Sequence, residues 1–158
     1  MDTEDIESTT YKMIGTFAKT IEWFDLSPLE ARLFAYLYIA EDSKTLDDMS
    51  DALGKSKTSM STSIRSLSQL NLVKRVWKKG CRKNLYKANR QLFRTFITCY
   101  MHRWIEHTKQ QRHSLNHLKK QLEPTEAKIH RQLEQMITFH TDIERFIEQM
   151  KDVQQTIE

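Results

Sequence analysis

The stretch TLDDMSDALGKSKTSMSTSIRSLSQ, residues 45–69, decides the fold that we expect. Thr45 and Asp48 have the spacing of a capping box, which predicts a short helix beginning at Leu46. Gly54 suits the left-handed conformation that commonly ends such a helix. Ser56 then caps a second helix, which we expect to run to about residue 70. Two helices joined by a short turn that contains glycine are typical of a helix-turn-helix motif.

The second of these helices has one apolar face and one small polar face. Met60, Ile64 and Leu67 recur at helical spacing and should pack inward. Short hydroxyl side chains on the opposite side would let the helix approach a DNA major groove closely, and an arginine fork there can read a guanine edge. The residues expected to face DNA on this helix are Thr58, Ser59, Ser61, Thr62, Arg65 and Gln69. The residues expected to meet phosphate at its N-terminus are Lys55, Ser56 and Lys57.

A basic β-hairpin is predicted directly after the helix-turn-helix. Two short β-prone runs, residues 73–77 and 83–87, flank Gly80. The cations at the hairpin tip are Lys78, Lys79, Arg82 and Lys83. A hairpin in this position is the wing of a winged helix, and its tip could lie along or enter a minor groove.

Long helices are predicted on both sides of this unit. An amphipathic helix should end near Trp23, and Ser27 before Pro28 predicts a helix that runs to about Glu41. Helical spacing resumes at Arg90 and stops at Pro124. The last segment carries a heptad seam, against which we expect another helix to pack. The seam residues are Ile129, Leu133, Met136, His140, Ile143, Ile147, Met150, Gln154 and Ile157.

These elements predict a mainly α fold with a small β-hairpin wing. We expect a dimerisation helix in residues 1–24, a winged helix-turn-helix in residues 25–89 and a helical dimerisation region in residues 90–158. A two-fold dimer would hold its two reading helices about 34 Å apart, which predicts a pseudo-palindromic double-stranded DNA operator.

The charge distribution supports a polyanionic partner. Between Ala52 and Ile105 lie thirteen of the 25 lysines and arginines and none of the 21 acidic residues. We call residues 52–105 the acid-free segment. A chain concentrates positive charge in this way, against its own repulsion, mainly when an anion such as nucleic acid offsets it.

The composition narrows the classes of protein to which the chain could belong. Three glycines and two prolines favour long helices, and no apolar run is long enough to cross a bilayer. No secretory signal is visible, so we expect a cytoplasmic protein associated with the nucleoid, with Cys81 and Cys99 reduced. No nucleophile with its base, paired-carboxylate site, metal-ligand set or phosphate-binding loop occurs, so we expect neither an enzyme nor a cofactor.

The helix-turn-helix sequence and the wing sequence LVKRVWKKGCRKNLYKA, residues 72–88, resemble the MarR superfamily, and within it the branch of the glycine betaine synthesis repressor, GbsR. The segments at residues 17–20 and 26–28 resemble the same branch. The resemblance implies a dimeric winged-helix repressor of osmoprotectant uptake or synthesis genes, with choline, glycine betaine or a related quaternary ammonium compound as effector.

Such a cation would be bound by aromatic rings through cation–π attraction. Trp23, Tyr100 and Trp104 are our candidates for this cage. Two alternatives stay open: a DNA-binding regulator without a small-molecule ligand, and a basic winged-helix and coiled-coil module that binds RNA or an acidic protein.

Overall fold

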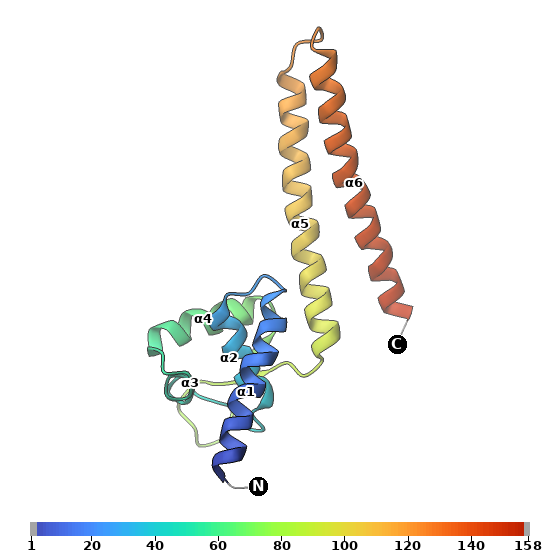
Figure 1. The fold of residues 1–158 in the computed structure, drawn as a ribbon. Helices are drawn as coiled ribbons and strands as arrows, with labels where there is room; N and C mark the ends of the chain where they lie inside the picture. The colour runs from blue at the N-terminus through green and yellow to red at the C-terminus, as the bar shows by residue number, and fades with distance from the viewer. Residues whose placement is uncertain (1–2, 157–158) are drawn as a thin grey trace. The chain divides into compact units, whose positions relative to one another are not determined.

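The computed structural model describes residues 3–156 and divides the chain into two compact units, with the boundary between Ile97 and Thr98. The first unit holds the winged helix-turn-helix and the second is a helical hairpin (Figure 1). The elements are α1 (Thr3–Glu22), α2 (Pro28–Ile39), α3 (Leu46–Leu53), α4 (Lys57–Gln69), β1 (Val73–Val76), β2 (Leu85–Ala88), α5 (Leu92–Gln121) and α6 (Ala127–Thr156).

The helix boundaries follow the capping signals in the sequence. The Ser27 Oγ accepts a hydrogen bond from the Glu30 N–H at 3.2 Å, and the Glu30 carboxylate accepts one from the Ser27 N–H at 2.9 Å. A hydroxyl cap of this kind contributes about 1 kcal/mol to helix stability. At α3, the Asp48 carboxylate accepts hydrogen bonds from the backbone and hydroxyl of Thr45, which lower the pKa of Asp48.

The predicted helix ends are also confirmed. Gly54 has a φ of 63°, and Asn71, which follows α4, has a φ of 58°. Both values lie in the left-handed region, where glycine and asparagine are the usual residues. These two turns fix the direction in which α4 leaves α3 and the direction in which β1 leaves α4.

The core of the first unit lies beneath α4. Met60 and Leu67 of α4 are fully buried, together with Phe34 of α2 and Met49 of α3. The Phe34 ring meets the Phe96 ring edge to face, with centroids 5.0 Å apart. The predicted inward face of α4 is therefore confirmed, and α4 is held against a close-packed scaffold.

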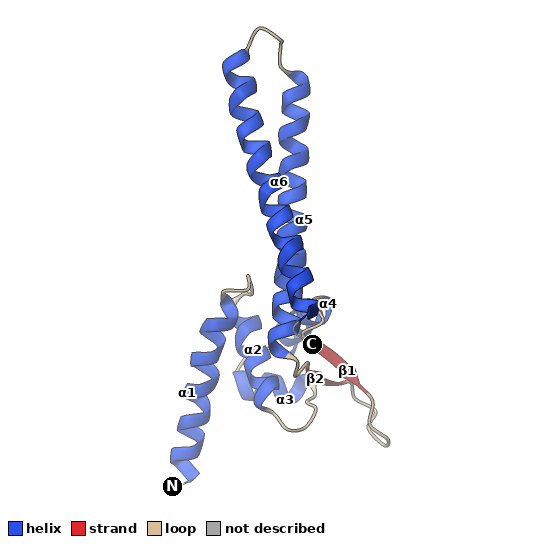
Figure 2. Ribbon diagram, turned by 90° about the vertical axis from the view of Figure 1, so that its right-hand side faces the viewer, coloured by secondary structure: helices blue, strands red, loops and turns tan. Residues whose placement is uncertain are grey.

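The wing is an antiparallel pair in which Val73 lies opposite Ala88 and Val76 opposite Leu85. Figure 2 shows β1 and β2 continuing into an extended loop, residues 77–84, that projects beyond the strands. Lys44 adds a short antiparallel bridge to Tyr86, with two backbone hydrogen bonds of 2.9 Å. This bridge, which the sequence did not indicate, anchors the wing to the segment that precedes α3.

In the second unit α5 and α6 run antiparallel, side by side (Figures 1 and 2). The Arg112 guanidinium donates two hydrogen bonds to the Glu144 carboxylate, at 2.8 and 3.2 Å, and Lys119 pairs with Glu134. Paired hydrogen bonds between a guanidinium and a carboxylate are strong and directional. They fix which faces of the two helices meet.

The predicted α6 seam is only partly covered within the hairpin. Leu133 and Ile147 are buried and His140 is half-buried, but the predicted seam residues Ile129, Met136 and Met150 are exposed. Ile157 and the side chain of Gln154 lie outside the described residues. Among residues 3–156, no helix is both long enough and apolar enough to cross a membrane.

Candidate nucleic-acid interface

The candidate interface is built on α4, which we call the recognition helix, and on the wing loop of residues 77–84. Ser56 caps the helix: its hydroxyl accepts the Ser59 N–H at 3.1 Å. The Ser59 hydroxyl lies 2.9 Å from that of Ser56. A helix N-terminus of this kind, with its first-turn N–H groups and the positive end of the helix dipole, attracts phosphate.

The outward side of the recognition helix has the character that the sequence predicted. Thr58, Thr62, Arg65 and Gln69 are exposed, while Ser59 and Ser61 are half-buried at its edges. The Thr62 hydroxyl donates to the Thr58 carbonyl at 3.1 Å, which leaves its oxygen lone pairs available. Arg65 has no ion-pair partner among the described residues, so its guanidinium is available to a base edge.

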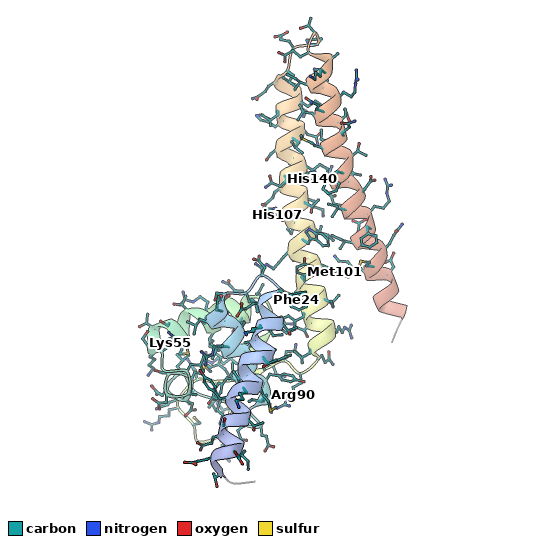
Figure 3. All side chains as sticks on the ribbon, viewed as in Figure 1. Phe24, Lys55, Arg90, Met101, His107 and His140 are labelled. Atoms are coloured by element: carbon teal, nitrogen blue, oxygen red, sulfur yellow. The ribbon has the colours of Figure 1, made fainter. Side chains whose placement is uncertain are left out.

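The cations around this helix are also exposed. Lys55 lies in the turn between α3 and α4 (Figure 3), where the Ser50 hydroxyl donates to the Lys55 carbonyl at 2.5 Å. That bond orients the backbone of the turn without using the lysine ammonium. Lys78, Lys79 and Arg82 are exposed on the wing loop, which turns at Gly80 with a φ of 83°.

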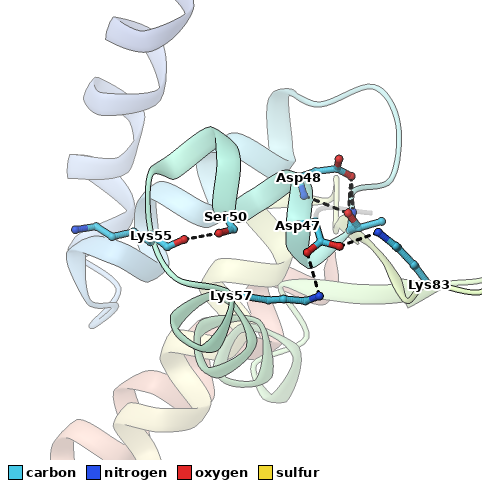
Figure 4. A network of polar contacts seen from close by, with 7 residues as sticks. Asp47, Asp48, Ser50, Lys55, Lys57 and Lys83 are labelled. Carbon is cyan, nitrogen blue, oxygen red and sulfur yellow. Dashed lines mark hydrogen bonds and ion pairs between the residues drawn. The ribbon is translucent and has the colours of Figure 1, made fainter.

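Two of the predicted DNA contacts are held by an acidic residue. The Asp47 carboxylate on α3 lies 3.0 Å from the Lys57 ammonium and 2.8 Å from the Lys83 ammonium (Figure 4). Hydrogen bonds first from Lys83 and then from Lys57 hold the pKa of Asp47 below its usual value. The same contact raises the pKa of Lys83.

The sequence missed the role of Asp47. This residue lies five positions before the acid-free segment and looked like an ordinary first-turn acid of α3. Its contact with Lys83 spans 36 residues, so local spacing could not reveal it. Asp48 and Asp51 lie even nearer to the acid-free segment, so the sequence did not single out Asp47 as the residue that pairs with it.

The three residues of the predicted aromatic cage fall in both units. Trp23 follows α1 in the first unit and is 85% exposed. Tyr100 and Trp104 lie on α5 in the second unit, with ring centroids 5.7 Å apart. An apolar groove of about 680 Å³ between α1 and α2, lined in part by Met13, Phe17 and Tyr38, contains none of the three.

Comparison with known proteins agrees with this architecture. The model of the MarR family matches residues 24–76. YvaV, named as an HTH-type transcriptional regulator of Bacillus subtilis (strain 168), is 28% identical over 155 residues, which are 90% of this chain and 88% of YvaV. The HTH-type transcriptional repressor GbsR of the same organism is 31% identical over 99 residues, which are 63% of this chain and 54% of GbsR. This chain thus spans about half the length of GbsR.

A solved crystal structure of a transcriptional regulator shares the fold. It aligns with a TM-score of 0.71 and 17% identity, over 94% of this chain and 99% of that one. The MarR-like winged helix-turn-helix fold predicted from the sequence is therefore confirmed. YvaV and GbsR are both named as transcriptional regulators, in agreement with the expectation that the chain is not an enzyme.

Proposed function

We propose that this chain is a transcriptional repressor that binds a double-stranded DNA operator through the recognition helix and the wing. One observation carries the proposal: an exposed, acid-free α4 surface with Arg65 at its centre is mounted on a buried core and followed by a cationic wing. The buried residues Met60 and Leu67 hold the helix, so its outer face is available for a ligand. The order of helix, turn, helix and wing is the one in which this class of motif places a helix in the major groove.

Each predicted contact has a role in this proposal. Lys55, Lys57 and the N-terminus of α4 would meet phosphates and set the register of the helix on the duplex. Arg65, with Thr58, Thr62 and Gln69 near it, would read base edges. Lys78, Lys79, Arg82 and Lys83 would follow the neighbouring backbone or minor groove.

A fluorescence anisotropy titration tests this function. A labelled duplex from the region upstream of the gene is compared with a scrambled duplex of the same composition, each at two salt concentrations. We expect tighter binding to the upstream duplex and a loss of affinity for both as salt rises, because phosphate contacts release counterions. Equal binding to both duplexes, or a preference for single-stranded RNA or an acidic protein, would refute a sequence-specific operator.

We further propose that the repressor is a homodimer and that α6 supplies part of the interface. Beside the face that meets α5, α6 carries an outer stripe: Met136, Phe139, Ile143, Phe146 and Met150. The members alternate at steps of three and four, and Phe139 and Phe146 are 62% and 58% exposed. A second helix from another copy would remove this stripe from water, as in a four-helix bundle. Dimerisation is also what a pseudo-palindromic operator requires.

The proposal extends to the genes that the repressor controls and to its effector. The resemblance of the helix-turn-helix and wing sequences to the GbsR branch implies control of osmoprotectant uptake or synthesis genes, and the 31% identity to the repressor GbsR over 99 residues supports a repressor. Choline or glycine betaine is the proposed effector, with Trp23, Tyr100 and Trp104 as cage residues. Isothermal titration calorimetry with choline, glycine betaine and, as a control, an alkylammonium of different shape tests it. No heat from choline or glycine betaine, in a preparation that still binds the operator, would leave a repressor without a small-molecule ligand.

A further inference from the structure

Asp47 on α3 links the start of the recognition helix to the wing loop. Its two carboxylate oxygens each take one ammonium group, Lys57 at the start of the recognition helix and Lys83 in the wing loop (Figure 4). The Asp47 side chain is 41% exposed, so this is a surface arrangement open to exchange. A carboxylate that bridges two cations offers them the same oxygen pair that a phosphate would offer.

The surroundings of this bridge are suited to an anion. A cleft of about 260 Å³ beside Asp47 is lined in part by Lys57, Arg82, Lys83 and Asn84. Its wall thus presents three cations and an amide, with Asp47 as its single acidic side chain. The shifts in the pKa of Asp47 and of Lys83 both favour the charged forms, so the bridge is ionic at neutral pH.

We propose that Asp47 is an internal competitor of DNA phosphate and a positioning residue for the wing. The inference rests on the proposed DNA binding. In the free protein Asp47 occupies Lys57 and Lys83, so two of the proposed DNA contacts are withheld from any duplex that happens to touch the surface. A duplex gains those lysines only by displacing Asp47, whose own charge repels phosphate.

This competition would act on specificity. Nonspecific binding depends almost entirely on phosphate contacts, so withholding two lysines weakens it most. An operator also gains base contacts from Arg65, and these compensate for the displacement of Asp47. While Asp47 holds Lys83, it also keeps the wing loop near the recognition helix, in a position from which both can reach one duplex.

The matched variants are Asp47→Asn and Asp51→Asn. Both remove one negative charge from α3, but Asp51 is exposed and forms no ion pair with Lys57 or Lys83. For Asp47→Asn we expect scrambled duplex to bind about tenfold more tightly at low salt. The slope of log affinity against log salt concentration should become steeper by about one to two units, because each phosphate contact contributes about 0.9. The ratio of operator to scrambled affinity should fall. Asp51→Asn should change both affinities by the same small factor, and Asp47→Glu should restore the original slope.

Hydrogen exchange of the free protein gives a readout that does not involve DNA. Residues 77–84 should exchange faster in Asp47→Asn than in Asp51→Asn, with the α2 and α4 core unchanged as evidence of folding. Equal slopes and equal wing exchange in the two asparagine variants would overturn the inference. If the original protein fails to distinguish operator from scrambled duplex, the proposed function fails, while the exchange comparison still decides whether Asp47 holds the wing.

Discussion

The winged helix-turn-helix and the helical hairpin differ in how they treat their large apolar side chains. From Pro28 to Ala88 the only such side chain that is exposed is Trp77, on the wing loop. In the hairpin, Met136, Phe139 and Phe146 of α6 are each more than half exposed. A contiguous apolar stripe on a surface marks an interaction site, whereas a single exposed ring needs no explanation. The first region is therefore complete in one chain, and the second has the surface of half an interface.

The two regions differ in charge as well. From Ala52 onward the winged helix-turn-helix carries only basic ionisable groups besides Cys81 and Tyr86, whereas acidic and basic residues are interspersed along α6. The surface that we propose to bind DNA thus suits a partner of opposite charge, whereas the outer stripe of α6 suits an apolar partner. Changes in the two regions should consequently affect different properties of the molecule.

The largest expected effect is on the stability of the first unit. Phe34→Ala removes a fully buried ring that contacts Phe96 and Tyr38, which leaves a cavity in the core. The expected loss is about 3–5 kcal/mol in the free energy of unfolding. Urea denaturation followed by circular dichroism measures it. A loss below about 1 kcal/mol would contradict the description of this unit as closely packed.

In the hairpin, the expected effect is on assembly. Phe139→Ser combined with Phe146→Ser places hydroxyls on the outer stripe and leaves Arg112 and Glu144 in place. The dimer should dissociate at protein concentrations where the original chain remains associated, because each buried ring contributes about 1.5–3 kcal/mol. Sedimentation equilibrium measures the change in the dissociation constant of the dimer. As a matched control, Gln135→Ser and Gln149→Ser alter exposed residues of α6 outside the stripe, and they should not alter the mass.

On the reading surface, Arg65→Ala should relax base preference. The expected reduction in discrimination between the operator and a single-base variant is about 1–3 kcal/mol, which is the value of one bidentate guanine contact. Competition binding with a set of single-base variants identifies the position that Arg65 reads. A preference profile that is unchanged by the substitution would assign base readout to another residue.

The smallest expected effect is the loss of DNA affinity caused by a substitution in the wing. Lys79→Ala should weaken all duplexes alike and lower the salt slope by about one unit, because one phosphate contact is lost. Lys109→Ala, an exposed lysine of α5, serves as the control and should leave the slope unchanged. If Lys79→Ala alters base preference more than the slope, the tip of the wing reads bases.

Local signals in the sequence predicted most of the fold. Ser27, Thr45 and Ser56 cap the three helices as expected, and Gly54 and Asn71 adopt the left-handed turns that end two of them. Each of these features depends on residues only a few positions apart. The inward face of α4 also followed from helical spacing, because one close-packed core accepts only one apolar face.

Contacts between distant residues could not be predicted in this way. Nothing near Asp47 in the sequence indicates Lys83, and nothing near Lys44 indicates Tyr86. In α6, helical spacing predicted a narrow seam that omits Phe139 and Phe146, and it did not show which edge of the apolar surface α5 covers. Arg112 and Glu144 decide that question, and they leave Met136 and Met150 on the open side.

The most direct test of the account is hydrogen exchange of the whole chain with and without operator duplex. If the first region reads DNA, exchange should slow in residues 55–69 and 77–84 and remain unchanged in the outer stripe of α6. Protection that appears in α6 and leaves the recognition helix and the wing unaffected would contradict the central claim.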